Sequence, residues 1–280
     1  MDELLRLLPP IRRTRGNRLY AADGRRFLDL WMDGGRGVMG EAERPARGYA
    51  ANAVDKGLVH PYPGLYDARL AKALLRAWPR FGAVRLYADE AGALAAAGRI
   101  LGDAAARPVD PAGRAPGSPG PASTSRAGFM LARPFVPAEA YDACALAMVR
   151  LPLARALSPA ALMAADEAAF GSEAGELVPG MRCYAAARAL DSLARAPERD
   201  YGEPHWRLFD KRMAGYFERR GPYLLARCDE GAYRRFFEAA LAGGALVAPR
   251  RDEPAAVPAD FDDGELKRLA AALAEAGFGA

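Results

Sequence analysis

Cysteine is scarce in this chain. Only three cysteines, Cys144, Cys183 and Cys228, occur among 280 residues, and they are widely separated. An odd number of distant thiols, with no CxxC spacing, excludes a disulfide framework and a cysteine-based zinc site. This usage is typical of a reducing compartment, so we expect a cytoplasmic protein in which the three thiols pack as small apolar side chains.

Long apolar runs are also missing. No stretch of 18 or more apolar residues is free of charge, so the sequence predicts no membrane span. The N-terminal MDELLRLLPPIRR has two acidic residues at its start and lacks a small-residue cleavage site. It therefore does not have the form of a secretory signal.

Lysine and histidine are rare. There are 35 arginines but only four lysines, which are Lys56, Lys72, Lys211 and Lys267. The net charge of +4 is modest, and the arginines are interspersed with acidic residues rather than gathered in a basic stripe, so we expect no nucleic-acid partner. The two histidines, His60 and His205, have no metal-type neighbours in sequence, and we expect no metal site.

Strand and helix patterns alternate along the chain. Arg18–Ala21 and residues 26–31 are rich in aromatic and branched side chains, and Asp23-Gly24 between them predicts a hairpin turn. Asp89 is placed to cap a following helix. Further strands are expected at 83–87, 129–132, 144–152, 222–228 and 245–248. Helices are expected at 2–8, 46–56, 67–78, 90–101, 158–170, 181–196, 205–219, 230–242 and 262–276.

Residues 103–126 differ from their surroundings. Proline, glycine, serine and alanine dominate this stretch, and it has no apolar periodicity. Such a composition predicts a disordered linker. The alternation of strands and helices on both sides of it indicates an α/β architecture.

Two motifs near the N-terminus point to a known family. Asp23-Gly24-Arg25-Arg26-Phe27-Leu28-Asp29 is followed by the glycine-rich Gly34-Gly35-Arg36-Gly37-Val38-Met39-Gly40. Both resemble the opening hairpin and glycine run of the class III aminotransferases, which are pyridoxal-phosphate-dependent transferases of fold type I. Residues 69–79 resemble the helix before that family's phosphate-binding turn, and the last hundred residues are similar in element order to its small C-terminal domain.

The resemblance implies a reduced aminotransferase-like α/β fold with a truncated central large domain and a C-terminal α+β small domain. We expect three parts. Residues 1–57 form an N-terminal segment with the hairpin, 58–178 form the truncated large-domain remnant, and 179–280 form the small domain. The resemblance also implies pairing through the large domain, so a homodimer is expected.

Departures from the family pattern concern the cofactor. The family's phosphate turn is similar in position to residues 86–91, where this chain has Asp89 and Glu90, whose charges would repel a phosphate. No lysine occurs between Lys72 and Lys211, across the region where the family places its Schiff-base lysine. We therefore expect a degenerate, non-catalytic protein without bound pyridoxal phosphate and with a binding or structural role. The alternative is an active aminotransferase with unorthodox cofactor anchoring.

A candidate pocket or interface is predicted from segments that border the active-site mouth in the family. Its residues are Trp31, Asp33, Gly35, Arg36, Gly37, His60 and Tyr62. Core and turn packing is the competing interpretation of the same residues. The spacing Gly35-x-Gly37-x-x-Gly40 also matches a dinucleotide fingerprint, but Pro45 follows and no helix is expected to begin at Gly40. The sequence does not identify a small ligand or protein partner.

Overall fold

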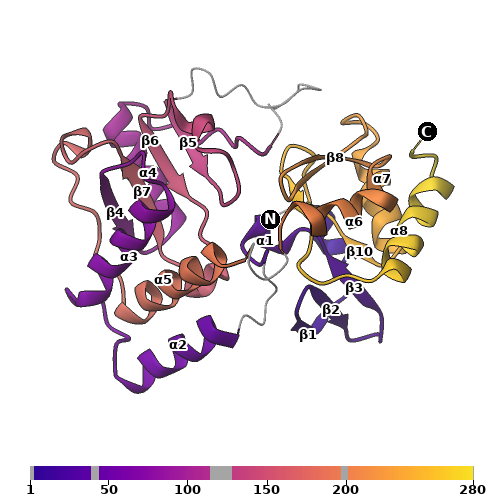
Figure 1. Ribbon diagram of the computed structural model, residues 1–280, viewed down its shortest axis with the longest axis horizontal. Coiled ribbons are helices and arrows are strands. Elements are labelled where there is room, and N and C mark those ends of the chain that lie inside the picture. The colour runs from indigo at the N-terminus through magenta and orange to yellow at the C-terminus, as the bar shows by residue number, and fades with distance from the viewer. Residues whose placement is uncertain (1–2, 39–43, 114–127, 197–200, 280) are drawn as a thin grey trace. The chain divides into compact units, whose positions relative to one another are not determined.

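The computed structural model describes residues 3–38, 44–113, 128–196 and 201–279, and its path is drawn in Figure 1. The chain divides into two compact units. Unit 1 comprises Met1–Ala42, Ala112–Pro121 and Ala196–Ala280, and unit 2 comprises Glu43–Pro111 and Ala122–Arg195. Among the described residues, no helix combines the length and apolar character needed to cross a membrane. The predicted three-part division of the chain stays a prediction.

Unit 2 is built on a four-stranded mixed sheet. The strands are β4 (Ala83–Tyr87), β5 (Phe129–Ala132), β6 (Leu146–Val149) and β7 (Ala160–Ala164), in the order β4-β7-β6-β5. β7 runs antiparallel to both β4 and β6, whereas β5 is parallel to β6. β4, β5 and β6 therefore all end at the same edge of the sheet.

Helices cover both faces of this sheet. On one face, α4 (Glu90–Leu101) places Ala93, Ala96 and Ala97 against buried residues of every strand. On the other face, α3 (Leu65–Ala77) and α5 (Gly180–Ala194) pack over the sheet, and α2 (Arg44–Asp55) lies against α5. Short 3-10 turns complete the unit: η2 (Ala138–Tyr141), η3 (Arg155–Leu157) and η4 (Ala168–Phe170).

The prediction of a helix at 158–170 is wrong. Ala160–Ala164 forms β7, which is paired on both sides and buried at every position. Alanine favours helices, but a helix there would leave β4 and β6 without the strand that lies between them. The small side chains also let helices on both faces approach the sheet. Tertiary packing overrides local propensity at this strand.

In the part of unit 1 that the structure describes, two small sheets are accompanied by helical segments of different lengths. One sheet has the order β1 (Ile11–Arg15), β2 (Arg18–Ala21), β3 (Arg26–Asp29) and β10 (Ala245–Leu246), and the other β11 (Ala255–Ala256), β9 (Tyr223–Ala226) and β8 (Phe217–Arg220). The helical segments are η1 (Glu3–Leu7), α6 (Glu203–Met213), α7 (Tyr233–Ala242) and α8 (Asp263–Glu275). A tight turn labelled α1 (Met32–Gly35) follows β3.

The predicted hairpin is confirmed. β2 and β3 pair antiparallel, and Gly24 takes the positive φ of 89° that the turn between them requires. The predicted helix at 205–219 is wrong at its end, because Phe217–Arg220 forms β8 paired with β9. α3 begins at Leu65, two residues before the expected start at Asp67. Asp67 lies inside the first turn and accepts a hydrogen bond from the backbone N–H of Gly64.

The first part of the predicted linker is bound to the sheet instead of being structureless. The backbone of Val109 donates to Phe129 and accepts from Leu131, so this residue lies beside β5. Asp110 then forms an ion pair with Arg133. The remaining part of the prediction, residues 114–126, lies outside the described residues.

Candidate functional site at the carboxyl edge of the unit 2 sheet

The edge where β4, β5 and β6 end is the natural place for a site. In open α/β sheets, ligands bind beyond the carboxyl ends of parallel strands. Here that edge is formed by the residues that follow the three strands, Ala88, Arg133 and Arg150, together with Ser158, which precedes the antiparallel β7. We call this set the carboxyl edge.

The N-terminus of α4 lies at the carboxyl edge and carries two carboxylates. Asp89 caps the helix, with its Oδ1 accepting a hydrogen bond of 2.8 Å from the N–H of Gly92, as predicted. Glu176 provides the second carboxylate, and its Oε2 accepts a hydrogen bond of 2.8 Å from the N–H of Ala88. Free N–H groups and the helix dipole favour negative charge at such a terminus, so both contacts are stabilising.

Glu176 reaches this position because its segment runs along β4, which is an edge strand. The N–H of Glu176 donates to the carbonyl of Leu86 at 2.8 Å, and Arg85 Nε donates to the carbonyl of Glu173 at 2.8 Å. Gly175 has a φ of 79°, and a Cβ there would lie 3.0 Å from the Leu86 oxygen. The glycine therefore permits both the turn and the close approach to the strand.

Arg182 brings a cation into the same region from the first turn of α5. Its Nη2 donates to the carbonyl of Ser158, and its buried Nε has no hydrogen-bond partner among the described residues. Burial lowers the pKa of Arg182, while Cys183 and Asp89 act in the opposite direction. The guanidinium thus partly offsets the negative charge of Asp89.

At the end of β5, the buried Arg133 contacts Asp110 and Tyr141. Arg133 Nε lies 2.8 Å and 2.9 Å from the two carboxylate oxygens of Asp110, and Nη2 lies 2.5 Å from Oδ2. The backbone N–H of Arg133 donates to the hydroxyl of Tyr141 at 3.0 Å. Burial raises the pKa of Tyr141, so this hydroxyl stays protonated in the physiological range. These contacts fix the backbone at the carboxyl edge.

Five of the predicted pocket residues lie together in unit 1. Trp31, Asp33, Gly35, Arg36 and Gly37 belong to the turn around α1, in which Asp33 has a φ of 51°. The buried guanidinium of Arg36 lies 3.7 Å from the carboxylate of Asp33. Two residues outside the predicted set hold this turn. Asp29 accepts hydrogen bonds from the N–H groups of residues 31 and 32. Asn17 donates a hydrogen bond to the carbonyl of residue 37.

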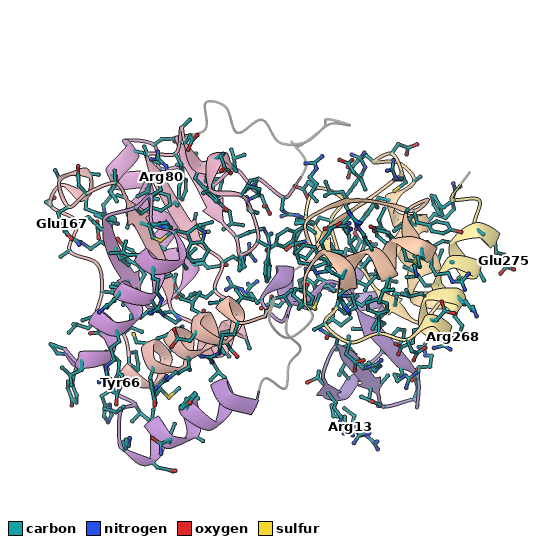
Figure 2. The ribbon with its side chains drawn as sticks, in the orientation of Figure 1. Arg13, Tyr66, Arg80, Glu167, Arg268 and Glu275 are labelled. Carbon is teal, nitrogen blue, oxygen red and sulfur yellow. The ribbon has the colours of Figure 1, made fainter. Side chains whose placement is uncertain are left out.

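The other two predicted residues belong to unit 2. His60 and Tyr62 are exposed in the connection between α2 and α3, with their rings 5.6 Å apart. Tyr66, labelled in Figure 2, follows them in the first turn of α3 and packs against Tyr184 of α5 at 4.8 Å. The assignment of the seven residues to a pocket or an interface stays a prediction.

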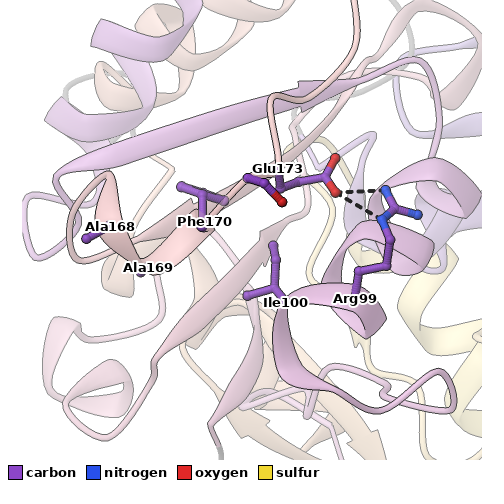
Figure 3. A pocket seen from close by; sticks show the side chains of 8 residues that line it. Arg99, Ile100, Ala168, Ala169, Phe170 and Glu173 are labelled. Carbon is purple, nitrogen blue, oxygen red and sulfur yellow. Dashed lines mark hydrogen bonds and ion pairs between the residues drawn. The ribbon is translucent and has the colours of Figure 1, made fainter.

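A hollow of about 340 Å³ opens between the end of α4 and the η4 turn. Figure 3 shows Arg99 and Glu173 joined across its rim, with Arg99 Nε 3.0 Å from Glu173 Oε2. Ile100, Phe170 and Ser172 contribute to its lining. The facing charges are already paired with each other. In the described ranges, no three His, Cys, Asp or Glu side chains are grouped to hold a metal ion.

Relatives in sequence are distant. No protein-family model matches the chain. An uncharacterized protein of Treponema pallidum (strain Nichols) is 28% identical over 286 residues, which cover 91% of each chain. An uncharacterized protein of Borreliella burgdorferi is 29% identical over 80 residues, covering 29% of this chain and 30% of that protein. These relatives indicate common ancestry without indicating a function.

Solved structures give a clearer likeness. The N-acetylornithine aminotransferase of Stenotrophomonas maltophilia K279a matches with a TM-score of 0.63 at 16% identity, covering 98% of this chain and 99% of that one. An omega-transaminase of Sphaerobacter thermophilus matches with a TM-score of 0.65 at 14% identity, covering 96% and 91%. The ornithine aminotransferase of Plasmodium yoelii gives 0.67 at 11% identity, covering 95% and 92%. The chain therefore has the mixed α/β fold of the class III, pyridoxal-phosphate-dependent aminotransferases.

Proposed function

We propose that this chain is a degenerate, non-catalytic protein of the aminotransferase fold, a pseudoenzyme whose role is to bind a partner or to serve as structure. The observation that carries the proposal is the placement of its lysines. Pyridoxal phosphate is held in its enzymes as an imine of a lysine that lies inside the site. All four lysines of this chain are exposed, and none lies at the carboxyl edge.

The position of each lysine supports this proposal. Lys56 follows α2 and Lys72 lies on the exposed side of α3, so neither belongs to a strand end of unit 2. Lys211 and Lys267 lie on α6 and α8 of unit 1, and Lys267 Nζ is 2.9 Å from Asp263. Because all four side chains are exposed, none is enclosed in a site where an imine with the cofactor would be held.

The charge at α4 also disfavours the cofactor. A phosphate ester at a helix N-terminus needs free N–H groups and a positive local potential. At α4 the N–H groups of Ala88 and Gly92 already donate to Glu176 and Asp89. The residues present therefore do not fit the phosphate of pyridoxal phosphate, and we derive no reaction step through that group.

Reductive trapping tests the proposal. The purified protein is incubated with pyridoxal phosphate, reduced with borohydride and mapped by peptide mass spectrometry, with an active aminotransferase treated in parallel. We expect no lysine to be labelled stoichiometrically and no absorbance band of an imine before reduction. Stoichiometric labelling of one lysine would contradict the proposal and favour the active, unorthodox aminotransferase.

A binding role fits the surface at one corner of unit 2. Large apolar side chains are exposed from the last turn of α2 to the first turn of α3 and before α5, and they are Val54, Val59, Tyr62, Leu65 and Leu177. Leu65 is 74% exposed and Tyr62 is 70% exposed. Contiguous exposed apolar residues mark interaction sites. We propose that a second copy of this chain covers this surface, which we call the α2–α3 corner.

A further inference from the structure

We propose that the carboxylate of Glu176 occupies the place of a ligand phosphate at the N-terminus of α4. It thereby closes the carboxyl edge to phosphate groups. The inference deepens the proposed function and rests on it, since it explains how a chain with this fold excludes the phosphate end of the cofactor. It is independent of where the lysines lie.

Backbone contacts on both sides of Glu176 determine where its side chain points. The N–H of Glu176 is bound to Leu86, the last residue but one of β4, while its carboxylate is bound to the N–H of Ala88 just beyond that strand. One residue thus contacts the strand through its main chain and the strand-to-helix turn through its side chain. This pairing holds the carboxylate of Glu176 at the turn, although the residue stays exposed to solvent.

Gly92 provides the room that the carboxylate needs. A Cβ built on Gly92 would lie 2.8 Å from Glu176 Oε1, which is closer than real Cβ contacts allow. The same residue donates its N–H to Asp89. The absence of a side chain at residue 92 therefore leaves a space beside the helix terminus, and Glu176 fills that space.

The two carboxylates accept hydrogen bonds from two of the N–H groups at this terminus. Glu176 takes the N–H before the helix, and Asp89 takes the N–H inside its first turn. A phosphate dianion arriving here would have to displace both acceptors while remaining close to their charges. Charge repulsion and competition for the same N–H groups act in the same direction.

The test compares two double variants that each remove two negative charges. Asp89→Ser/Glu176→Ala empties the terminus and retains a neutral helix cap, since serine caps as well as aspartate. Asp89→Ser/Glu173→Ala is the matched control, because Glu173 lies on the same segment but pairs with Arg99. Inorganic phosphate is titrated into each protein and into wild type, and the amide signals of Ala88 and Gly92 are followed by NMR.

We expect a saturable shift of both amide signals in the emptied variant, with an apparent affinity at least tenfold tighter than in the control or in wild type. Without phosphate, the Ala88 amide should exchange with solvent at least tenfold faster in Glu176→Ala than in Glu173→Ala. The inference would be overturned if phosphate bound wild type with the same affinity as the emptied variant. It would also be overturned if phosphate shifted neither amide signal in an emptied variant that circular dichroism shows to be folded. Lysine labelling would overturn the proposed function alone, since phosphate titration involves no lysine.

Discussion

Asp110 and Arg133 form a bidentate ion pair in which the guanidinium is 1% exposed and the carboxylate 21% exposed. The two residues are 23 positions apart, and the carboxylate belongs to the stretch whose composition predicts a linker. The pair fastens residues 109–110 beside β5, at the carboxyl edge. A buried guanidinium is tolerated there because a carboxylate neutralises it.

Removing the carboxylate should be costly. We predict that Asp110→Asn lowers the free energy of unfolding by about 3 kcal/mol, because it removes a carboxylate that is paired with the buried charge of Arg133. Glu167→Gln is the control, because it breaks the Arg85 ion pair with a carboxylate that is largely exposed, and it should cost less than about 1 kcal/mol. Urea denaturation measures both values. An equal loss of unfolding free energy in the two variants would contradict the larger contribution expected of the buried Asp110–Arg133 pair.

Two buried tyrosines of unit 2 should respond oppositely to loss of the hydroxyl. The buried hydroxyl of Tyr87 has no hydrogen-bond partner among the residues that the structure describes, whereas that of Tyr141 accepts from the N–H of Arg133. We predict that Tyr87→Phe is neutral or stabilises by about 1 kcal/mol, since it removes an unsatisfied polar group. Tyr141→Phe should destabilise by about 1 to 2 kcal/mol, since it orphans a buried N–H. Thermal and urea unfolding of both variants measure the direction of each stability change. A Tyr87→Phe variant less stable than wild type would refute the interpretation that the Tyr87 hydroxyl is unsatisfied.

Acid should weaken the contact between α6 and α8. Hydrogen bonding from Arg212, followed by that from Lys267, lowers the pKa of Asp263 to about 2. Because the folded pKa lies below the unfolded one, this carboxylate stabilises the fold fully above about pH 4, and the contribution is lost as the pH falls toward 2. In Arg212→Ala, the pKa of Asp263 should rise toward its ordinary value, as an NMR titration of the carboxyl carbon would show. Arg207→Ala is the control, and an unchanged Asp263 pKa in Arg212→Ala would contradict the prediction.

Self-association should depend on the α2–α3 corner. We expect light scattering at micromolar concentration to give the mass of a homodimer for wild type, because burial of Leu65 and Tyr62 against a second copy removes apolar surface from water. Leu65→Glu should shift the mass toward that of the monomer. Leu208→Glu changes an exposed leucine of α6, which belongs to unit 1 and not to the α2–α3 corner, and should leave the dimer intact. A monomeric wild type would reject the interface.

Local sequence determined the elements whose signals lie within a few residues. The sequence predicts the hairpin turn at Asp23-Gly24, the limits of β4 and α4, and the cap at Asp89, and all of these are present. Each depends on hydrogen bonds between near neighbours in the chain, such as that from the Gly92 N–H to Asp89. Such contacts are encoded by the residues that make them, so sequence analysis could find them.

Tertiary structure decided the features that local sequence signals contradict or do not encode. The Ala160–Ala164 segment has the composition of a helix, but two neighbouring strands make it β7. At the candidate site, sequence analysis identified Asp89 but not Glu176, whose carboxylate meets Ala88 across 88 residues. Nothing near Glu176 in sequence marks it, because its position depends on the chain returning to the free edge of β4. A contact between residues so far apart in the chain forms only when the sheet and its covering helices have already fixed the path between them.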